Sequence, residues 1–353
     1  MRKNLWMFRT VVDKVPFRFE NPELKTVLST DFADYTDLNP VNLCNRAKRV
    51  DKNTLEMRLS LKREEPTVKT EASASLLISC PDQQGIVCAV TDFLMRHNGN
   101  IIDLEQHTDT EEAAFFMRVE WELDGFALPR DQISEKFRLI ADRHQMKYEL
   151  HFSDYRPRMA IFVSKFSHCI RDMLSRWHSG EWSAEIPLII SNHPDMEPLA
   201  KMYGIDFKLI KITKDNKVEQ EAQTLKLLRE YNIDLIVLAR YMQILSDDFC
   251  ANFPNRIINI HHSFLPAFVG AKPYHSAHQR GVKIVGATSH YVTPDLDEGP
   301  IIEQEVMRVS HKDSVESLIR KGRDLEKMVL SRAVWAHLQN KVLVYKNRTV
   351  IFN

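Results

Sequence analysis

The chain is poor in cysteine, and neither sign of charge is in excess. A disulfide framework or a cysteine-built zinc site needs paired cysteines at regular spacings, and no CxxC pair occurs here. The scattered distribution favours a reducing compartment. Basic and acidic residues both number 48 among 353 residues, so no surplus positive charge is available to hold a nucleic acid. The cysteines are Cys44, Cys80, Cys88, Cys169 and Cys250.

Long apolar runs are also missing. No stretch approaches the roughly 20 residues of a membrane helix, so we expect no membrane partner. The opening MRKNLWMFRTVV is basic and apolar, but Asp13 and Glu20 follow soon after it, unlike the acid-poor peptides that direct organelle import. The sequence thus predicts a cytoplasmic protein, with mitochondrial import as the alternative if residues 1–70 contain a targeting segment. These residues show no sustained period, and we expect an N-terminal extension or linker that need not be ordered.

A regular pattern begins near Ser75. Short apolar strands and amphipathic helices follow in the order βαββαβ over residues 74–155, which is typical of a split βαβ, ferredoxin-like sandwich. The turn PDQQGIV and the stretch NGNIIDLEQ resemble those of ACT domains. That resemblance implies regulation by a small amino acid, such as glycine or methionine, or pairing with copies of the same chain. A purely structural role is the alternative.

Residues 157–353 predict an α/β domain. Near-continuous β-branched strands alternate with amphipathic helices, which indicates a doubly wound, mostly parallel sheet covered on both faces. A helix over residues 313–339 and a hairpin turning at Lys346–Asn347 are expected to follow. Ligands of such sheets bind beyond the carboxyl ends of the strands. The strand RIIN runs directly into NIHHSFLPAFVGAKPYH, so this histidine-rich loop is expected at that edge.

Two motifs in this domain resemble the folate-dependent formyltransferase fold. They are Asn259-x-His261 with the following SFLP, and the distant LDEGP that contains Asp297. The resemblance covers residues 159–353. It implies that Asn259, His261 and Asp297 are the catalytic residues.

The chemistry of formyl transfer suits these residue types. Attack on an N-formyl carbon creates an oxyanion, which the amide of Asn259 can stabilise by donating a hydrogen bond. His261 can donate to the same oxyanion or pass a proton to the leaving nitrogen, and Asp297 can orient it and accept the nucleophile's proton. Taken singly, each residue is better explained as a turn former or a structural side chain, and it is their combination in this order that favours catalysis.

The turn that would bind the acceptor of the formyl group distinguishes between the enzymes of this fold. The resemblance implies that enzymes formylating glycinamide ribonucleotide cradle its phosphate in a glycine-rich loop after the first strand. The equivalent turn here, SKFSHCIRD, contains no glycine, and Phe166 and His168 would occupy that space. Water is then the available nucleophile. The SHC turn, His262 in place of proline and an amino-terminal ACT domain resemble the formyltetrahydrofolate deformylases. This resemblance implies hydrolysis of 10-formyltetrahydrofolate to formate and tetrahydrofolate, which supplies formate for purine synthesis and balances one-carbon pools.

The pterin is expected against the segment after strand IDLIVL and against the acidic turn before LDEGP. The candidate folate-binding residues are Met242, Gln243, Ile244, Leu245, Val292, Thr293 and Asp295. Core packing is the alternative for Leu245. His262 is the candidate for positioning water.

Three other interpretations remain open at this point. The domain could formylate an amine or an amino sugar, or bind folate or an amino acid without catalysis. A metal held by His261, His262, His275 and His278 is the third, but adjacent histidines on a strand point to opposite faces, and no recognised zinc spacing occurs. We therefore expect no metal or other cofactor, and we expect a homo-oligomer.

Overall fold

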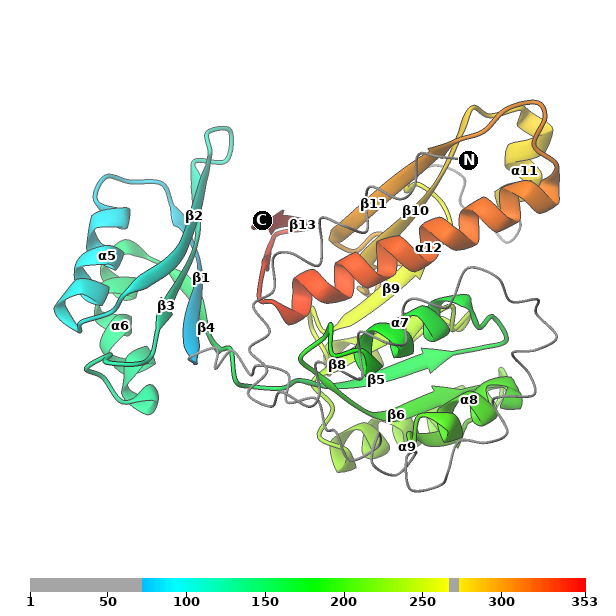
Figure 1. The fold of residues 1–353 in the computed structure, drawn as a ribbon, viewed down its shortest axis with the longest axis horizontal. Helices are drawn as coiled ribbons and strands as arrows, with labels where there is room; N and C mark the ends of the chain where they lie inside the picture. Colours follow the sequence, from blue (N-terminus) through cyan, green and yellow to red (C-terminus); the bar gives the residue numbers. More distant parts are fainter. Residues whose placement is uncertain (1–71, 267–272) are drawn as a thin grey trace, which may run out of the picture. The chain divides into compact units, whose positions relative to one another are not determined.

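A computed structural model describes residues 72–266 and 273–353 of the chain (Figure 1). The extension expected over residues 1–70 lies outside the described residues, as does the part of the histidine-rich loop from 267 to 272. Among the helices of the described ranges, none combines the length and the apolar composition that crossing a membrane requires.

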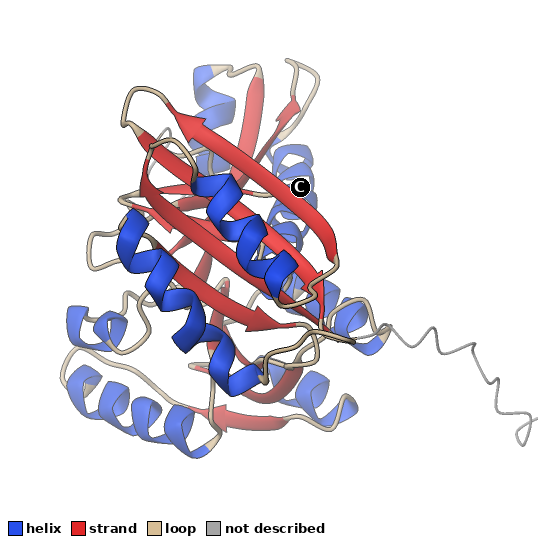
Figure 2. Cartoon of the chain, turned by 90° about the vertical axis from the view of Figure 1, so that its left-hand side faces the viewer, coloured by secondary structure: helices blue, strands red, loops and turns tan. Residues whose placement is uncertain are grey.

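The first unit is an antiparallel four-stranded sheet with two helices, and its βαββαβ order is the predicted one. The strands are arranged in the order β2-β3-β1-β4. Figure 2 shows both helices on one face of this sheet. The elements are β1 (Ser73–Pro81), α5 (Ile86–Arg96), β2 (Ile101–Asp109), β3 (Ala114–Glu122), α6 (Arg130–His144) and β4 (Lys147–Phe152).

Alternation along the two central strands builds the core of this unit. Leu76 and Ile78 of β1 and Met117 and Val119 of β3 are buried in one cluster with Phe137 of α6. Because successive strand residues point to opposite faces, these positions form one continuous apolar surface for the helices. Burying each such side chain contributes roughly 1.5–3 kcal/mol.

The second unit is a seven-stranded sheet in the order β11-β10-β9-β8-β5-β6-β7. Pairs from β9 to β7 are parallel, whereas β10 runs antiparallel to both β9 and β11. This is the expected doubly wound, mostly parallel architecture. Its strands are β5 (Arg158–Val163), β6 (Glu185–Ser191), β7 (Asp206–Leu209), β8 (Leu235–Ala239), β9 (Ile257–His261), β10 (Ile284–Tyr291) and β11 (Ile301–Arg308).

Helices follow most of these strands, and a hairpin closes the chain. The hairpin turns at Lys346, whose φ of 54° is in the left-handed region, as the sequence predicted. The remaining elements are α7 (His168–His178), η2 (Pro194–Met196), α8 (Glu197–Met202), α9 (Lys217–Glu230), α10 (Asp247–Ala251), α11 (Pro273–Arg280), α12 (Val315–Leu338), β12 (Val342–Tyr345) and β13 (Arg348–Ile351).

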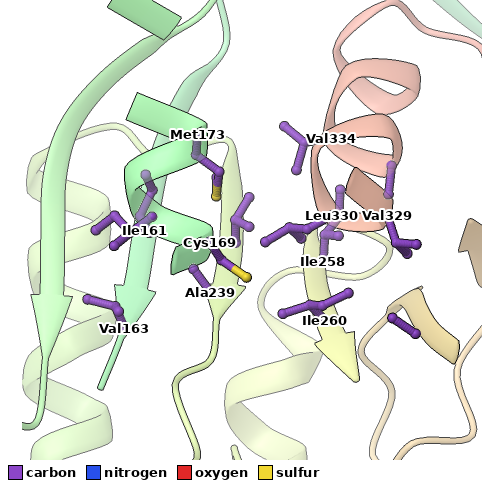
Figure 3. Packing of buried hydrophobic residues seen from close by; sticks show 14 of the residues in the cluster. Ile161, Val163, Cys169, Met173, Ala239, Ile258, Ile260, Val329, Leu330 and Val334 are labelled. Atoms are coloured by element: carbon purple, nitrogen blue, oxygen red, sulfur yellow. The ribbon is translucent and has the colours of Figure 1, made fainter. Parts of the chain in front are cut away.

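The sheet is packed on both faces. On one face, Ile161 of β5 and Ile258 of β9 meet Met173 of α7 and Leu330 of α12 (Figure 3). On the other face, Phe162 packs in a cluster with residues of α9 and α10. Strand β5 lies between β8 and β6, so the chain winds first to one side of it and then to the other. The carboxyl ends of β5 and β8 therefore flank a topological switch point, where doubly wound sheets bind ligands.

Candidate functional site

Strand β9 carries two of the expected catalytic side chains on one face of the sheet. Ile258 and Ile260 are buried against α7 and α12, so the alternate residues Asn259 and His261 face the opposite side. Strand β10 pairs with β9 in antiparallel register, with His290 opposite Asn259. The site is therefore built on a pair of antiparallel strands.

The third residue, Asp297, reaches this pair from the loop after β10. Its Oδ1 lies 3.2 Å from Nδ1 of His261 and 3.7 Å from Nε2 of His290. The side-chain amide nitrogen of Asn259 lies 3.2 Å from the same Nε2 of His290. The structure thus brings Asn259, His261 and Asp297 into one cluster, with His290 between the amide and the carboxylate.

The LDEGP motif folds this loop back over the strands. Asp297 itself has a φ of 58°, and the backbone nitrogen of Tyr291 donates to the carbonyl of Pro300 at 2.9 Å. At Gly299, a Cβ would lie 1.8 Å from the carbonyl oxygen of Tyr291, so no other residue fits without moving the backbone. The loop also begins beside the start of β9, where the nitrogen of Val292 donates to Ile257 at 2.8 Å. The glycine therefore permits the tight return that aims Asp297 at His261.

The environment keeps Asp297 ionised. The hydrogen bond from His261 lowers the pKa of this carboxyl well below its usual value, against the opposing effect of burial. Such a carboxylate is a weak base but a strong fixed counter-charge for an imidazolium. The Nε2 of His261, on the far side of the ring, is buried and makes no hydrogen bond within the described residues. With Nδ1 directed at Asp297, the lone pair of Nε2 is available to accept a proton.

His262 lies beside this cluster in a different state. Its ring centroid is 5.1 Å from that of His261. Burial lowers the pKa of His262 from 6.5 to about 4, and the nearby charge of Arg240 contributes. The ring is consequently neutral at pH 7, when it can both donate and accept a hydrogen bond.

His290 is the site residue that sequence reasoning did not single out. It is 2% exposed, and its Nδ1 lies 2.9 Å from the carbonyl oxygen of Tyr291. Donation to that carbonyl leaves Nε2 as the acceptor for the amide of Asn259, which positions this amide. The available signal was a histidine within the apolar strand IVGATSHY, but only the register of β10 against β9 places it opposite Asn259.

The two segments expected to hold folate meet on the α9 side of the sheet. Leu245 is buried in the core cluster there, and Val292 packs against the same cluster. Leu245 is 8% exposed, so the structure assigns its side chain to the core, the alternative noted from the sequence. Met242 and Ile244, by contrast, are 55% and 61% exposed, as is common where a surface awaits a ligand.

The polar residues among the candidates for folate binding lie at the surface of the same loops. Gln243 and Thr293 are half-buried and Asp295 is exposed. The amide of Gln243 donates to the carbonyl of Met242 at 3.1 Å, and the hydroxyl of Thr293 donates to the carbonyl of Asp295 at 3.1 Å. Leu296, not singled out from the sequence, is 59% exposed beside them.

The turn after β5 has a partner on α12 that the sequence did not indicate. His168 does not fill open space but contacts the carboxylate of Glu326 on α12, with Nε2 and Oε2 2.7 Å apart. Phe166 is 41% exposed, and its ring lies between the guanidinium groups of Arg240 and Arg323, at 5.3 and 5.9 Å. The buried partner Glu326 could not be foreseen, because 158 residues separate it from His168.

Within the described ranges, one group has ligand atoms close enough to consider a metal ion: His168, Cys169 and Glu326, whose atoms lie within 4.8 Å of one another. Two features disfavour a cation there. The histidine and the carboxylate already bond to each other, and Nε of Arg240 lies 3.5 Å from the same carboxylate. Burial also raises the pKa of the Cys169 thiol well above its usual value. His275 and His278, from the metal interpretation, are exposed on α11.

Comparisons with known proteins match both units. The Formyl transferase family model matches residues 157–334, and the ACT domain model matches residues 74–138. A crystal structure of a formyltetrahydrofolate deformylase from Pseudomonas syringae is similar with a TM-score of 0.79 and 43% identity, covering 85% of this chain and 99% of that one. A glycinamide ribonucleotide transformylase from Symbiobacterium toebii gives a TM-score of 0.53 and 29% identity, covering 58% of this chain and 98% of that one.

Sequence relatives are more similar still. The formyltetrahydrofolate deformylase of Synechocystis sp. is 59% identical over 280 residues, which are 79% of this chain and 98% of the relative. That of Bacillus subtilis is 49% identical over 284 residues, 80% of this chain and 95% of the relative. At this identity, over almost the whole length of these relatives, the chain belongs to the formyltetrahydrofolate deformylase family.

Proposed function

We propose that this protein hydrolyses 10-formyltetrahydrofolate to formate and tetrahydrofolate. The observation that carries the proposal is the pair His261–Asp297, joined at 3.2 Å, with the other ring nitrogen of His261 buried and without a hydrogen bond. An imidazole oriented by a carboxylate on one nitrogen and open on the other can move a proton to and from a substrate.

In the proposed mechanism, the proton of water passes to Nε2 of His261 as the water oxygen attacks the formyl carbon. Asp297 stabilises the resulting imidazolium, a role that suits a carboxylate of lowered pKa better than direct proton abstraction. The amide of Asn259, held by His290, donates to the oxyanion of the tetrahedral intermediate. As the bond from carbon to N10 breaks, the proton moves from His261 to N10 and formate leaves.

We propose further roles for the neighbouring residues. The exposed side chains of Met242 and Ile244 provide an apolar surface for the pterin, and we propose that the segment from Val292 to Asp295 contacts its edge. His262, neutral because of burial, positions the attacking water. Proton transfer through His261 needs no metal ion, so we propose that the enzyme works without metal or other cofactor. Activity should persist after dialysis against a chelator.

Regulation and context follow from the family. The ACT match supports a small amino acid, glycine or methionine, as an effector of this chain. We also propose that the enzyme is a cytoplasmic homo-oligomer, whose formate supplies purine synthesis and balances one-carbon pools. Formate assays with and without each amino acid, and light scattering of the purified chain, test these two points.

Formate release from 10-formyltetrahydrofolate by the purified full-length chain tests the central proposal. Formate and tetrahydrofolate should appear in equal amounts with no amine added. A rate that depends on an added amine acceptor would contradict hydrolysis and indicate a formyltransferase.

A further inference from the structure

A buried carboxylate lies at the start of α7, behind His262 and outside the cluster of Asn259, His261 and Asp297. Glu326 is 1% exposed. Its Oε2 is 2.7 Å from Nε2 of His168, and its Oε1 accepts from the hydroxyl of Tyr274 at 2.8 Å. The Nε of Arg240 lies 3.5 Å away, at ion-pair distance, and makes no hydrogen bond within the described residues. Three donors from three segments therefore surround one carboxylate.

A glycine on α12 makes room for this arrangement. Gly322 precedes Glu326 by one helical turn on the same face of α12, and a Cβ at Gly322 would lie 2.0 Å from the hydroxyl oxygen of Tyr274. The glycine thus leaves room for the tyrosine to reach Glu326. The first turn of α7 has no acidic residue of its own, so α12 supplies the negative charge that this helix end receives.

The location is one where an anion would otherwise bind. His168 is the first residue of α7, which directly follows β5 at the topological switch point of the sheet. Helix amino termini at such points attract phosphate groups through free backbone N–H groups and the helix dipole. Arg240 and His168 would add two side-chain donors. A phosphate held there would lie close to the reactive centre, since the ring of His262 is 6.4 Å from that of Tyr274 and 5.1 Å from that of His261.

We propose that Glu326 determines the specificity of the reaction: its carboxylate takes the place of an acceptor's phosphate, repels phosphorylated amines and so leaves water as the nucleophile. The inference rests on the proposed hydrolysis. His168 and Tyr274 already bond to the carboxylate and Arg240 is its ion-pair partner, so an incoming anion would meet a like charge among these groups.

The charge of Glu326 is maintained despite its burial. Burial alone would raise the pKa of this carboxyl, but the hydrogen bond from His168, the charge of Arg240 and the bond from Tyr274 together lower it. A permanent negative charge is what exclusion of anions requires.

The test is phosphate binding by Glu326→Gln, which keeps the shape of the side chain and removes its charge. Inorganic phosphate should bind this variant at least about tenfold more tightly than the wild type, as seen in a phosphate-dependent rise of the thermal unfolding midpoint. Phosphate should also inhibit formate release by the variant at concentrations that leave the wild type unaffected. Glu326→Ala, which opens space for a small anion, should behave in the same way.

Matched controls separate the loss of the buried charge of Glu326 from a general loss of negative charge on α12. Asp324→Asn makes the same charge change on an exposed face of α12 and should leave the phosphate response unchanged. Arg240→Gln combined with Glu326→Gln removes both charges and should abolish the gained binding.

A Glu326→Gln variant that folds only with phosphate present would support the proposal. Folded Gln and Ala variants with the wild-type response would overturn it, as would failure of both to fold in either buffer. Because unfolding reports binding without turnover, these outcomes are independent of whether the wild type releases formate.

Discussion

Asp297 shows how one carboxylate can organise a site through its neighbours. It contacts His261 directly and lies 3.7 Å from His290, which in turn holds the amide of Asn259. Its lowered pKa makes it a constant negative charge across the physiological range. The carboxylate therefore sets the orientation of the imidazole of His261 and favours its positively charged form.

Replacing Asp297 with asparagine keeps the size of the side chain and removes this charge. We expect the kcat for formate release to fall by about 10²–10⁴, because the imidazolium loses its counter-charge and His261 its fixed orientation. The matched control is Glu298→Gln on the same loop, whose exposed side chain should leave the rate nearly unchanged. An Asp297→Asn variant with the wild-type rate would show that Asp297 has no role in the reaction.

His262 predicts a specific pH dependence of stability. Its pKa is 6.5 in the unfolded reference and about 4 in the fold, so the unfolded state binds the proton first as pH falls. The free energy of unfolding is therefore highest, as far as this residue is concerned, above pH 6.5, and it declines as the pH falls toward 4. At pH 5 the loss is about 2 kcal/mol.

Urea unfolding at pH 8 and pH 5 checks this prediction. His262→Gln should lose about 2 kcal/mol less than the wild type between the two pH values. His337, whose pKa burial also lowers to about 4, remains in the variant and should preserve part of the dependence. Equal losses in wild type and variant would show that the fold does not lower the pKa of His262.

The contrast between predicted and missed residues has a physical basis. Asn259, His261 and Asp297 stand in short local motifs, whose residue types already state their chemistry. His290 and Glu326 matter through contacts that no local pattern records, the first across a strand pair and the second across 158 residues. Leu245 was ambiguous for the opposite reason, since its packing depends on which face the loop turns inward.

At the scale of elements, β10 holds the segment that follows His262 in place. The hydroxyl of Thr288, fully buried, donates to the carbonyl of Ser263 and accepts from the nitrogen of Leu265 and the amide of Gln304. These bonds tie the segment after His262 to the neighbouring strand. The strand thus positions the loop that continues from His261 and His262.

Thr288→Val keeps the shape of this side chain and removes its hydroxyl. We expect a loss of about 2–3 kcal/mol in the free energy of unfolding, because buried donors are left without partners, together with a lower kcat. Thr288→Ser, which retains the hydroxyl, should restore most of both quantities. If valine were as stable as serine, the three hydrogen bonds would not be holding the loop.

Helix α12 carries a glycine for a packing reason. Alanine at Gly322 would favour the isolated helix by about 1 kcal/mol. In the fold, its Cβ would overlap the ring of Tyr274, 2.0 Å from the hydroxyl oxygen, so we expect a net destabilisation of about 1–3 kcal/mol.

A double-mutant cycle isolates this overlap. In a Tyr274→Ala background the space is free, and Gly322→Ala should become neutral or stabilising by up to about 1 kcal/mol in urea unfolding. The same cost of Gly322→Ala in both backgrounds would locate the strain elsewhere.

For the whole molecule, the relatives indicate which part of the chain we expect to need for activity. The Synechocystis sp. relative is matched over 98% of its own length by 79% of this chain. We therefore expect a chain that lacks residues 1–70 to release formate with a kcat/KM within about twofold of the full chain, a difference well under 1 kcal/mol. Both forms should be compared at equal concentration. A large loss would assign a catalytic or folding role to the extension.

The sequence by itself determined the two architectures and indicated the candidate catalytic residues. Apolar periodicity distinguishes strands from helices locally, so the βαββαβ unit and the doubly wound sheet could be predicted. The motifs around Asn259, His261 and Asp297 likewise carry their chemistry in consecutive residues.

Only the tertiary structure decided which side chains surround those groups. The antiparallel register of β10 places His290 against Asn259, and the packing of α12 on α7 places Glu326 at the helix start. Neither follows from composition or period, because register and helix packing are settled by side chains far apart in the chain that compete for the same buried space.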